Sequence, residues 1–542
     1  MTLHGTPVLI LKEDTSRTTG RDAISSNIAA ARVISEAIRS ALGPKGMDKM
    51  LLDSFGDVVI TNDGATILKE IDIAHPIGKM MVELSKIQDQ EVGDGTTTVV
   101  ILAGELLQKA SDLISTDKIH PTILVEGYRL ATEKAVEYLN EIATEISPDD
   151  ENLLIELVNT TMGSKIVSRS SGMLAKIVID SVKSIDPGTG KIDIEDIKVE
   201  KKEGEDIEAT TLIKGIVLDK EVVHAGMPKS LDNPTIALIA EAFEVSKTEF
   251  DSELSISDPT KIQEFLDREA GMLQKMVNKV VESGAKVVIA QKGIDDIAQH
   301  LMAKENIMAI RRVKKSDMEK LAKATGATIV NSIKDLSSDD LGTAGKVHET
   351  KVGDDDMVFV EDCPMAKSVT ILVRGGTELV VDEAERSIHD AICVVRNVFE
   401  DKKIVAGGGA PEAFVSRKLH KFAESLIGRE QLAVQAFADA LEIVPRTLAE
   451  NAGLDPIDII VALRSEHESG NYKAGVDVFE GKVRNMENII EPLRVKTHAL
   501  TAASENAQII LRIDDIISSK ASAGPGGPPG GPGGDMGGDD FD

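Results

Sequence analysis

One short segment combines a carboxylate, glycines and hydroxyls directly before a sequence typical of a helix. In EVGDGTTTVV, residues 91–100, the relevant positions are Gly93, Asp94, Gly95, Thr96, Thr97 and Thr98. A helix N-terminus offers free N–H groups and a partial positive charge, which favour an anion such as phosphate. The glycines allow close approach to the backbone. Because a carboxylate would repel phosphate, Asp94 suggests a bridging Mg²⁺ ion, which takes oxygen ligands from both.

The same segment has a simpler explanation. Asp94 could be an ordinary N-cap, whose side chain accepts a hydrogen bond from the first helical turn and contributes about 1 kcal/mol. The segment by itself does not decide between a cation ligand and a cap.

Three further clusters of glycine or aspartate could line the same site. LGPKG (residues 42–46) follows a predicted helix, Asp63 ends a predicted strand, and Gly407–Gly409 lie between two helical segments. Each would by itself be an ordinary turn. The sequence contains no GxxxxGK[ST] phosphate-binding loop and no GxGxxG after a strand. A known nucleotide motif is therefore not the basis of the prediction.

The composition limits the partners. The 542 residues carry a formal net charge of −30, which disfavours binding to nucleic acid and to anionic lipid. The absence of tryptophan and the presence of only 3 tyrosines argue against a base-stacking surface. No run of about 18 apolar residues predicts a membrane span, and no signal peptide is apparent, so we expect a cytoplasmic protein. Two cysteines, Cys363 and Cys393, are too few for a disulfide framework or a zinc cluster, and are predicted to be buried free thiols.

The elements that must position these residues form a nested pattern. Residues 22–42 have apolar side chains at helical spacing, with Asp22 as the expected N-cap and Gly43 as the stop. Two short strands around residues 54–56 follow, and then helices to about residue 145. From about 214, apolar strands alternate with helices in a βαβ rhythm that predicts parallel strands. After about 376 the sequence is helical again. Both ends therefore form one helical domain into which an α/β block is inserted.

Two segments stand apart from this pattern. Residues 245–275 have the character of a projecting insertion, with Phe250, Leu254 and Ile256 in a polar stretch before Pro259. The end of the chain, 521–542, is rich in glycine and proline, so it is expected to be disordered.

Several long motifs in one order resemble the group II chaperonins, in their archaeal form. These motifs are LGPKGMDKML, VVITNDGATIL, EVGDGTTTVVILAGELL, RRVKKSDMEKLAKATGA, GREQLAVQAFADALEIVPRTLAENAGLDPID and EPLRVKTHAL, and the resemblance runs from about residue 10 to 518. It implies an ATP-dependent chaperone that encloses and folds non-native proteins in a double-ring chamber built from identical or sister subunits.

The implied fold is a multidomain α/β chaperonin fold. It comprises a mainly helical equatorial domain, a small α+β intermediate domain and an α/β apical domain with a helical protrusion that acts as a lid. The corresponding segments are 1–146 and 404–520 (equatorial), 147–213 and 370–403 (intermediate), 214–369 (apical), 245–275 (protrusion) and 521–542 (tail).

The resemblance also implies site residues for ATP or ADP and Mg²⁺. Asp94 matches the family's Mg²⁺ ligand, and Asp63 and Asp390 match carboxylates that position or activate the attacking water. The phosphate-binding residues are Gly95, Thr96, Thr97, Thr98 and Gly43, with Leu42 and Pro44 beside it.

Other positions match parts of the pocket further from the metal. Lys165, after Ser164 in GSK, matches the lysine of a loop that senses the γ-phosphate. Gly408, Asp477 and Glu491 match the pocket for the base and ribose, and Lys496 lies beside it. Because Asp390 comes from a hinge domain, domain closure would complete the site and couple hydrolysis to conformation.

Two other classes of function are weighed against this one. A small-molecule kinase or ligase would need a second, acceptor site with a constellation of histidine, lysine or cysteine, but the 10 histidines are scattered. A passive ATP-binding holdase without turnover would not need Asp63, Asp94 and Asp390 together. A phosphate-release assay separates these classes.

Overall fold

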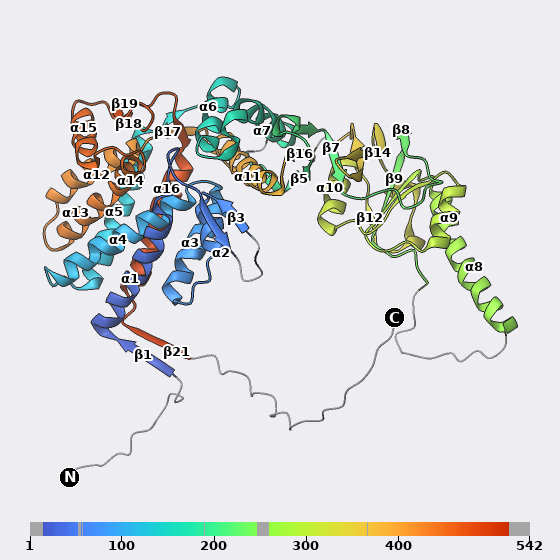
Figure 1. Cartoon of the computed structure of the whole chain (residues 1–542), viewed down its shortest axis with the longest axis horizontal. Coiled ribbons are helices and arrows are strands. Elements are labelled where there is room, and N and C mark those ends of the chain that lie inside the picture. Colours follow the sequence, from blue (N-terminus) through green and yellow to red (C-terminus); the bar gives the residue numbers. More distant parts are fainter. Residues whose placement is uncertain are drawn as a thin grey trace, which may run out of the picture.

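The computed structural model describes residues 15–52, 56, 58–188, 190–245, 259–365 and 367–519. Three large apolar cores follow one another along the long axis of the molecule (Figure 1). The first core takes residues from both ends of the sequence, within 28–139 and 405–511. The middle core lies within 146–197 and 369–404, together with Ile490, and the third lies within 216–360. The nested order expected from the sequence is therefore visible in the packing.

Helices form the first core. They are α1 (Gly20–Arg39), α2 (Gly64–Glu70), α3 (Pro76–Val92), α4 (Thr96–Ser115), α5 (Pro121–Ile142), α12 (Ala410–Glu424), α13 (Glu430–Leu441), α14 (Ile443–Asn451), α15 (Pro456–Glu468) and α16 (Leu493–Leu511). Helix α4 contacts α1, α3, α13 and α16 and is buried on nearly all sides, as its run VVILA requires. A helix held in this way gives its N-terminus a fixed position.

Short strands tie the two ends of the chain together in this region. They are β1 (Thr15–Thr19) with β21 (Asp515–Ser519), β2 (Lys49–Leu52) with β3 (Val58–Thr61), β4 (Thr144–Glu145) with β17 (Lys403–Ala406) and β20 (Ile490–Pro492), and β18 (Ala474–Asp477) with β19 (Lys482–Asn485). All of these pairs are antiparallel. The pair formed by β2 and β3 confirms the two strands predicted there.

The middle core joins segments from both sides of the inserted block. It contains α6 (Glu151–Met162), α7 (Ser171–Ile185), α11 (Glu378–Asp401), β5 (Ile197–Glu203), β6 (Thr211–Ile213) and β16 (Val369–Gly375). Strand β16 pairs with β5 in parallel and with β6 antiparallel. Helix α11 contacts α6, α7 and α3, so it links this core to the first one.

The third core contains the predicted parallel sheet. Strands β9 (Thr235–Ile239), β10 (Val287–Ala290), β11 (Met308–Ile310) and β12 (Ile329–Val330) are parallel, and β13 (Gly342–Thr343) is antiparallel to β9. A second, antiparallel sheet has the order β7 (Gly215–Leu218), β15 (Asp355–Glu361), β14 (Lys346–Val352) and β8 (Ser230–Asp232). Helices α8 (Pro259–Ser283), α9 (Asp296–Lys304) and α10 (Lys315–Thr325) complete this region.

The expected bounds of the first helix are wrong at both ends. The N-cap is Thr19 rather than Asp22, because β1 remains extended up to Thr19 and the helix begins directly after it. Asp22 lies in the first turn, where its charge is favourable for the helix dipole. The helix ends at Arg39, before the predicted stop, because the backbone tightens there and Leu42 N donates to Arg39 O.

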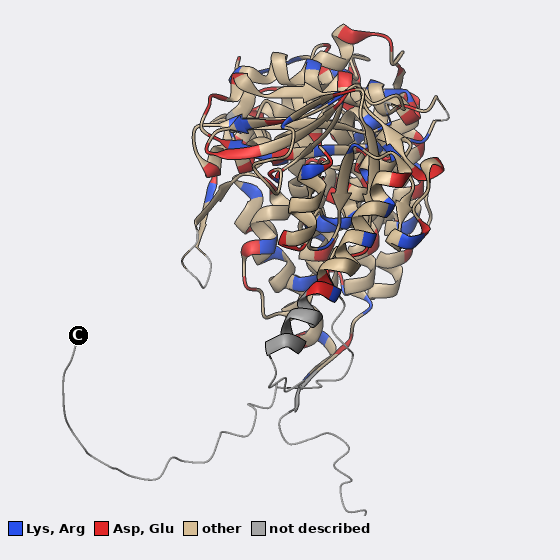
Figure 2. Ribbon diagram, turned by 90° about the vertical axis from the view of Figure 1, so that its right-hand side faces the viewer, with Lys and Arg blue, Asp and Glu red and all other residues tan. Residues whose placement is uncertain are grey.

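The structure bears on the expectations for the two cysteines and for membrane-spanning helices, but not on those for the lid and the tail. Cys393 is buried and Cys363 is half-buried, and both are free thiols. None of the helices in the described ranges has the length and apolar character needed to cross a bilayer. Figure 2 shows acidic and basic residues intermixed over the elements of the face that it presents. The apolar residues Phe250, Leu254 and Ile256 of the predicted lid, and the tail 521–542, lie outside the described residues.

Candidate functional site

A cavity of about 390 Å³ lies where the first core meets α6. Loops from four distant parts of the chain surround it, together with the N-terminus of α4. Predicted residues on its wall are Leu42, Gly43, Pro44, Asp94, Gly95, Thr98, Ser164, Gly408, Asp477, Glu491 and Lys496. The structure therefore brings together most of the residues that the sequence predicted for one site.

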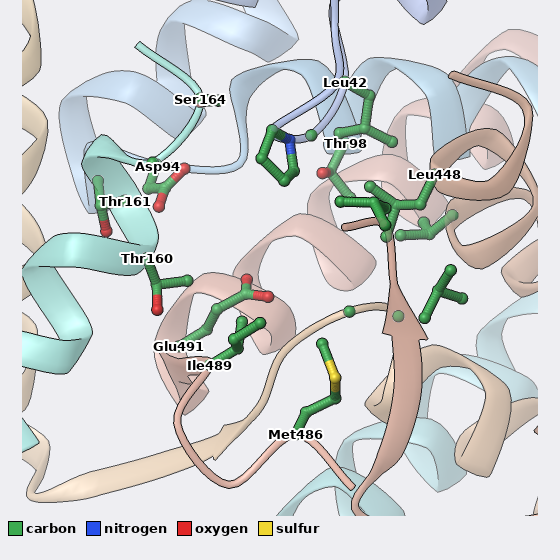
Figure 3. A pocket seen from close by; sticks show the side chains of 18 of the residues that line it. Leu42, Asp94, Thr98, Thr160, Thr161, Ser164, Leu448, Met486, Ile489 and Glu491 are labelled. Carbon is green, nitrogen blue, oxygen red and sulfur yellow. The ribbon is translucent and has the colours of Figure 1, made fainter. Parts of the chain in front are cut away.

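The backbone around Asp94 directs its side chain into this cavity. Gly93 and Gly95 have φ values of +79° and +80°, a left-handed conformation that L-residues rarely adopt. Gly95, not Asp94, is the N-cap of α4, so the simpler explanation of Asp94 as a cap is wrong. Asp94 Oδ1 accepts a 2.6 Å hydrogen bond from Gly95 N, and Figure 3 shows its carboxylate beside Thr161 at one end of the cavity.

The environment of Asp94 disfavours a bare negative charge. Burial, followed by the nearby carboxylates of Glu491 and Asp390, raises the pKa of Asp94 to about 6. Lys165 acts in the opposite direction but does not offset these effects. A buried carboxylate with other carboxylates around it is a site that a cation would stabilise.

This raised pKa predicts a pH-dependent gain in stability for Asp94→Asn. The folded carboxyl titrates at about 6 against a usual 3.8, so without metal wild-type stability falls as the pH rises from 4 to 6. Above pH 6 the full penalty applies, about 3 kcal/mol at 1.36 kcal/mol per pKa unit. Melting temperatures in chelator should therefore be several degrees higher for Asp94→Asn than for wild type at pH 7.5, and equal near pH 4.

The matched control is Asp112→Asn, an exposed position on the same helix. It should melt like wild type at both pH values. A melting temperature of Asp94→Asn that equals wild type at pH 7.5 would show that burial imposes no penalty on Asp94.

The three threonines after Gly95 have different environments. Only Thr98 lies on the cavity wall. Thr96 Oγ1 donates a 2.8 Å hydrogen bond to Asp63 Oδ1, and Thr97 packs against Gly64, where an added Cβ would lie 2.6 Å from Thr97 Oγ1. The Thr96 side chain thus orients Asp63, and the Thr97 side chain fixes α4 against α2.

Asp63, Lys165 and Asp390 form a charge cluster next to this cavity. Asp63 is the N-cap of α2 and accepts a 2.8 Å hydrogen bond from Thr66 N. Lys165 is ion-paired with Asp390 Oδ2 across a long sequence separation. Burial alone would raise the pKa of Asp63, but Lys165 and the bonds from Thr66 and Thr96 hold it below its usual value. Burial would lower the pKa of Lys165, yet Asp390 and Asp63 raise it.

The two predicted catalytic carboxylates line a different cavity from Asp94. Asp63 and Asp390 lie on the wall of a second cavity of about 360 Å³, which also contains Asp89 and His389. The charge of Asp390 nevertheless affects the pKa of Asp94, so the two cavities are close. The sequence predicted one site, and the structure divides its residues between two adjoining cavities.

On the same cavity wall, close enough to Asp94 to affect its pKa, Glu491 is fixed by a buried ion-pair network. Lys496 Nζ lies 2.7 Å from Glu491 and 3.0 Å from Glu412. Burial would lower the pKa of Lys496, but these two carboxylates raise it. The role of Lys496 visible here is therefore to position Glu491.

Asp477 lies on the cavity wall, but its oxygens already have partners. Oδ1 accepts hydrogen bonds from Phe479 N and Glu480 N, and Oδ2 is 2.5 Å from Arg484 Nε. These contacts close the turn between β18 and β19. The predicted contact of Asp477 with a ribose stays a prediction.

Sequence reasoning missed two parts of the cavity wall. One is a face of α6 that presents Glu156, Asn159 and Thr160, together with Thr161. The other is an apolar patch that includes Leu448 and Met486, which lie across the cavity from Asp94 in Figure 3. The spacing of Glu156, Asn159 and Thr160 places them on one helical face, but it is equally typical of a solvent-exposed face.

Comparisons with known proteins give a consistent result. A model of the TCP-1/cpn60 chaperonin family matches residues 34–521. The chain is 58% identical to a thermosome subunit of Methanopyrus kandleri, over 95% of each chain. It is 58% identical to the thermosome subunit beta of Archaeoglobus fulgidus over 96% of each chain, and 54% identical to the subunit alpha of that organism over 97%.

Proposed function

The chain belongs to the TCP-1/cpn60 chaperonin family, and on that premise we propose that it is an ATP-driven chaperone that encloses and folds non-native polypeptides. Identical or sister subunits would form two stacked rings around a chamber. The helices of the first core would form the equatorial ATPase domain. The middle core would correspond to the intermediate domain and the third core to the apical domain. The proposed location is the cytoplasm, without nucleic-acid or membrane partners.

One observation carries the ATPase proposal. The carboxylate of Asp94 lies in a cavity at the N-terminus of α4, where Gly95 has no side chain that could cap the helix. The free N–H groups favour a phosphate, whereas the carboxylate favours a cation and would repel a phosphate alone. A phosphate with a bound cation satisfies both groups.

The donor set of the cavity fits MgATP. Asp94 would hold Mg²⁺ through oxygen, while the backbone of Gly43, the N–H groups of the first turn of α4 after Gly95 and the Thr98 hydroxyl would hold phosphates. Glu491 has the acceptor oxygens that ribose hydroxyls require, and the apolar patch around Leu448 and Met486 would cover the base. The bound nucleotide with its metal would supply the phosphoanhydride bond that is cleaved.

The protein's own contribution to hydrolysis is positioning and proton transfer. Asp63, oriented by Thr96 and Thr66, would align the attacking water, and Asp390 would accept its proton. Because Asp390 lines the second cavity and pairs with Lys165, we expect α11 to move toward α4 before hydrolysis. Hydrolysis would then be coupled to movement of the middle core, to which α11 belongs.

The proposal is tested by phosphate release from MgATP without any client, together with electron microscopy of the purified protein. We expect steady turnover and a stacked double ring. A protein that binds ATP without turnover would be a holdase, and turnover that requires a small-molecule acceptor would indicate a kinase or ligase.

The proposed lid leads to a separate prediction. Deleting residues 246–257, which lie outside the described residues, should leave ATP hydrolysis and ring assembly unchanged. It should lower the yield of refolded client and leave the client open to protease, because a closed chamber needs a contact from every subunit. A deletion variant that still protects its client from protease would rule out this lid.

A further inference from the structure

The second cavity contains a cluster of metal-binding side chains that the ATPase mechanism does not use as a group. Asp89 lies on α3, and His389 and Asp390 are consecutive on α11. One ligand atom from each lies within 4.8 Å of the others. We propose that these three residues bind a divalent transition-metal ion, with Zn²⁺ as the preferred ion.

The chemistry of the three ligands distinguishes this site from the one at Asp94. Carboxylate oxygen and imidazole nitrogen are both ligand types that Zn²⁺ accepts, and three protein ligands would leave one of its four positions open. Imidazole favours Zn²⁺ and its neighbours in the first transition row, whereas Mg²⁺ prefers a site made only of oxygen ligands. Excess Mg²⁺ would therefore not fill this cluster.

The contacts of Asp89, His389 and Asp390 leave a ligand atom of each residue available for a metal ion. Lys165 engages Asp390 Oδ2, and Asp390 Oδ1 lies 3.8 Å from His389 Nδ1. Within the described ranges, no hydrogen bond or ion pair reaches the carboxylate of Asp89, although this side chain is only half-exposed. His389 has 47% of its side chain exposed, which gives an ion access from solvent.

The charge of the cavity also favours a cation. Its described lining contains five carboxylates, those of Asp63, Asp89, Glu195, Glu385 and Asp390. Lys165 offsets Asp390 and Asp63, and Lys201 pairs with Glu385, so among the described residues Asp89 and Glu195 have no ion pair. A half-buried carboxylate without a counter-ion is unfavourable, and a bound cation would relieve that cost.

The site has a functional consequence, which rests on the proposed function. A metal held between α3 and α11 would keep Asp390 in the second cavity, away from Asp94. Zn²⁺ would then inhibit hydrolysis without competing for the Mg²⁺ ligand. Because a metal-bound imidazole is neutral, binding would also release any proton carried by His389.

The test is a calorimetric titration of the full-length, nucleotide-free protein with Zn²⁺ in the presence of excess Mg²⁺. Wild type should bind one Zn²⁺ per chain. Asp89→Asn and His389→Gln should each weaken binding by more than about tenfold, since even a supporting residue of a metal site has an effect of that size. Glu195→Gln, which removes an exposed carboxylate from the same cavity, should bind like wild type.

No variant should melt below wild type by more than a few degrees in chelator, and Asp89→Asn should melt higher because it removes a half-buried charge. A loss of binding would then not reflect misfolding. Absence of Zn²⁺ binding in wild type, or undiminished binding in Asp89→Asn and His389→Gln, would overturn the proposal.

A parallel phosphate-release assay separates this proposal from the ATPase proposal. Zn²⁺ should inhibit wild type and Glu195→Gln, but not Asp89→Asn, whose rate in Mg²⁺ alone should be that of wild type. Inhibition that is equal in Asp89→Asn would refute the inhibitory role. A wild-type protein that binds Zn²⁺ but never hydrolyses MgATP would refute the ATPase proposal and leave the metal site intact.

Discussion

Asp94→Ala should reduce ATP hydrolysis by more than about a thousandfold and weaken MgATP binding. A metal ion held by Asp94 would contribute several kcal/mol of charge stabilisation in the transition state, and each 1.36 kcal/mol corresponds to about tenfold in rate. The glycines and N–H groups at the start of α4 would remain, so ATP without metal should still bind weakly. Single-turnover hydrolysis and MgATP titration measure the two effects.

The control for this variant is Asp112→Ala, which removes an exposed carboxylate from the same helix. It should hydrolyse ATP at the wild-type rate. If Asp94→Ala also keeps the wild-type rate, the cation is held elsewhere and the assignment of Asp94 is wrong.

Asp390→Ala should slow hydrolysis by about a hundredfold to ten-thousandfold, the usual contribution of a general base, and leave MgATP binding nearly unchanged. The reason is geometric, because Asp390 lies outside the cavity that contains Asp94. An interaction made only in the transition state lowers the rate and not the affinity.

Asp382→Asn is the matched control on the same helix, α11. It removes a partner of Lys201 in a partly exposed ion pair, which contributes at most about 1 kcal/mol. Its hydrolysis should be that of wild type. A parallel loss of binding and rate in Asp390→Ala would assign Asp390 to nucleotide binding instead of proton transfer.

The sequence allowed much of the fold to be predicted because its signals are local. Val99 to Ala103 form an apolar run that required a buried helix, and the apolar strands near residues 287, 308 and 329 alternate with helices as parallel strands do. The glycines on both sides of Asp94 were expected to let an anion approach the backbone, and the structure adds that both have a left-handed conformation.

The parts of the two cavities that were not predicted depend on contacts between residues far apart in the sequence, and the spacing of residues along one segment carries no information about such contacts. Nothing near Lys165 in the sequence indicates its ion pair with Asp390, 225 residues away. Asp89 and His389 are unremarkable on their own helices and become a cluster only because α3 meets α11. The polar face of α6 likewise became a cavity wall only through packing against the first core.

We propose that ATP hydrolysis by this protein drives the folding of its clients. The most direct test is refolding of a chemically unfolded client in the presence of MgATP. Wild type and Asp390→Ala should be measured side by side, with equal client binding verified before nucleotide is added. We predict that wild type returns active client over repeated cycles, whereas Asp390→Ala retains both client and ATP and yields little active client. Equal yields from the two proteins would contradict the account, because folding would then not require hydrolysis.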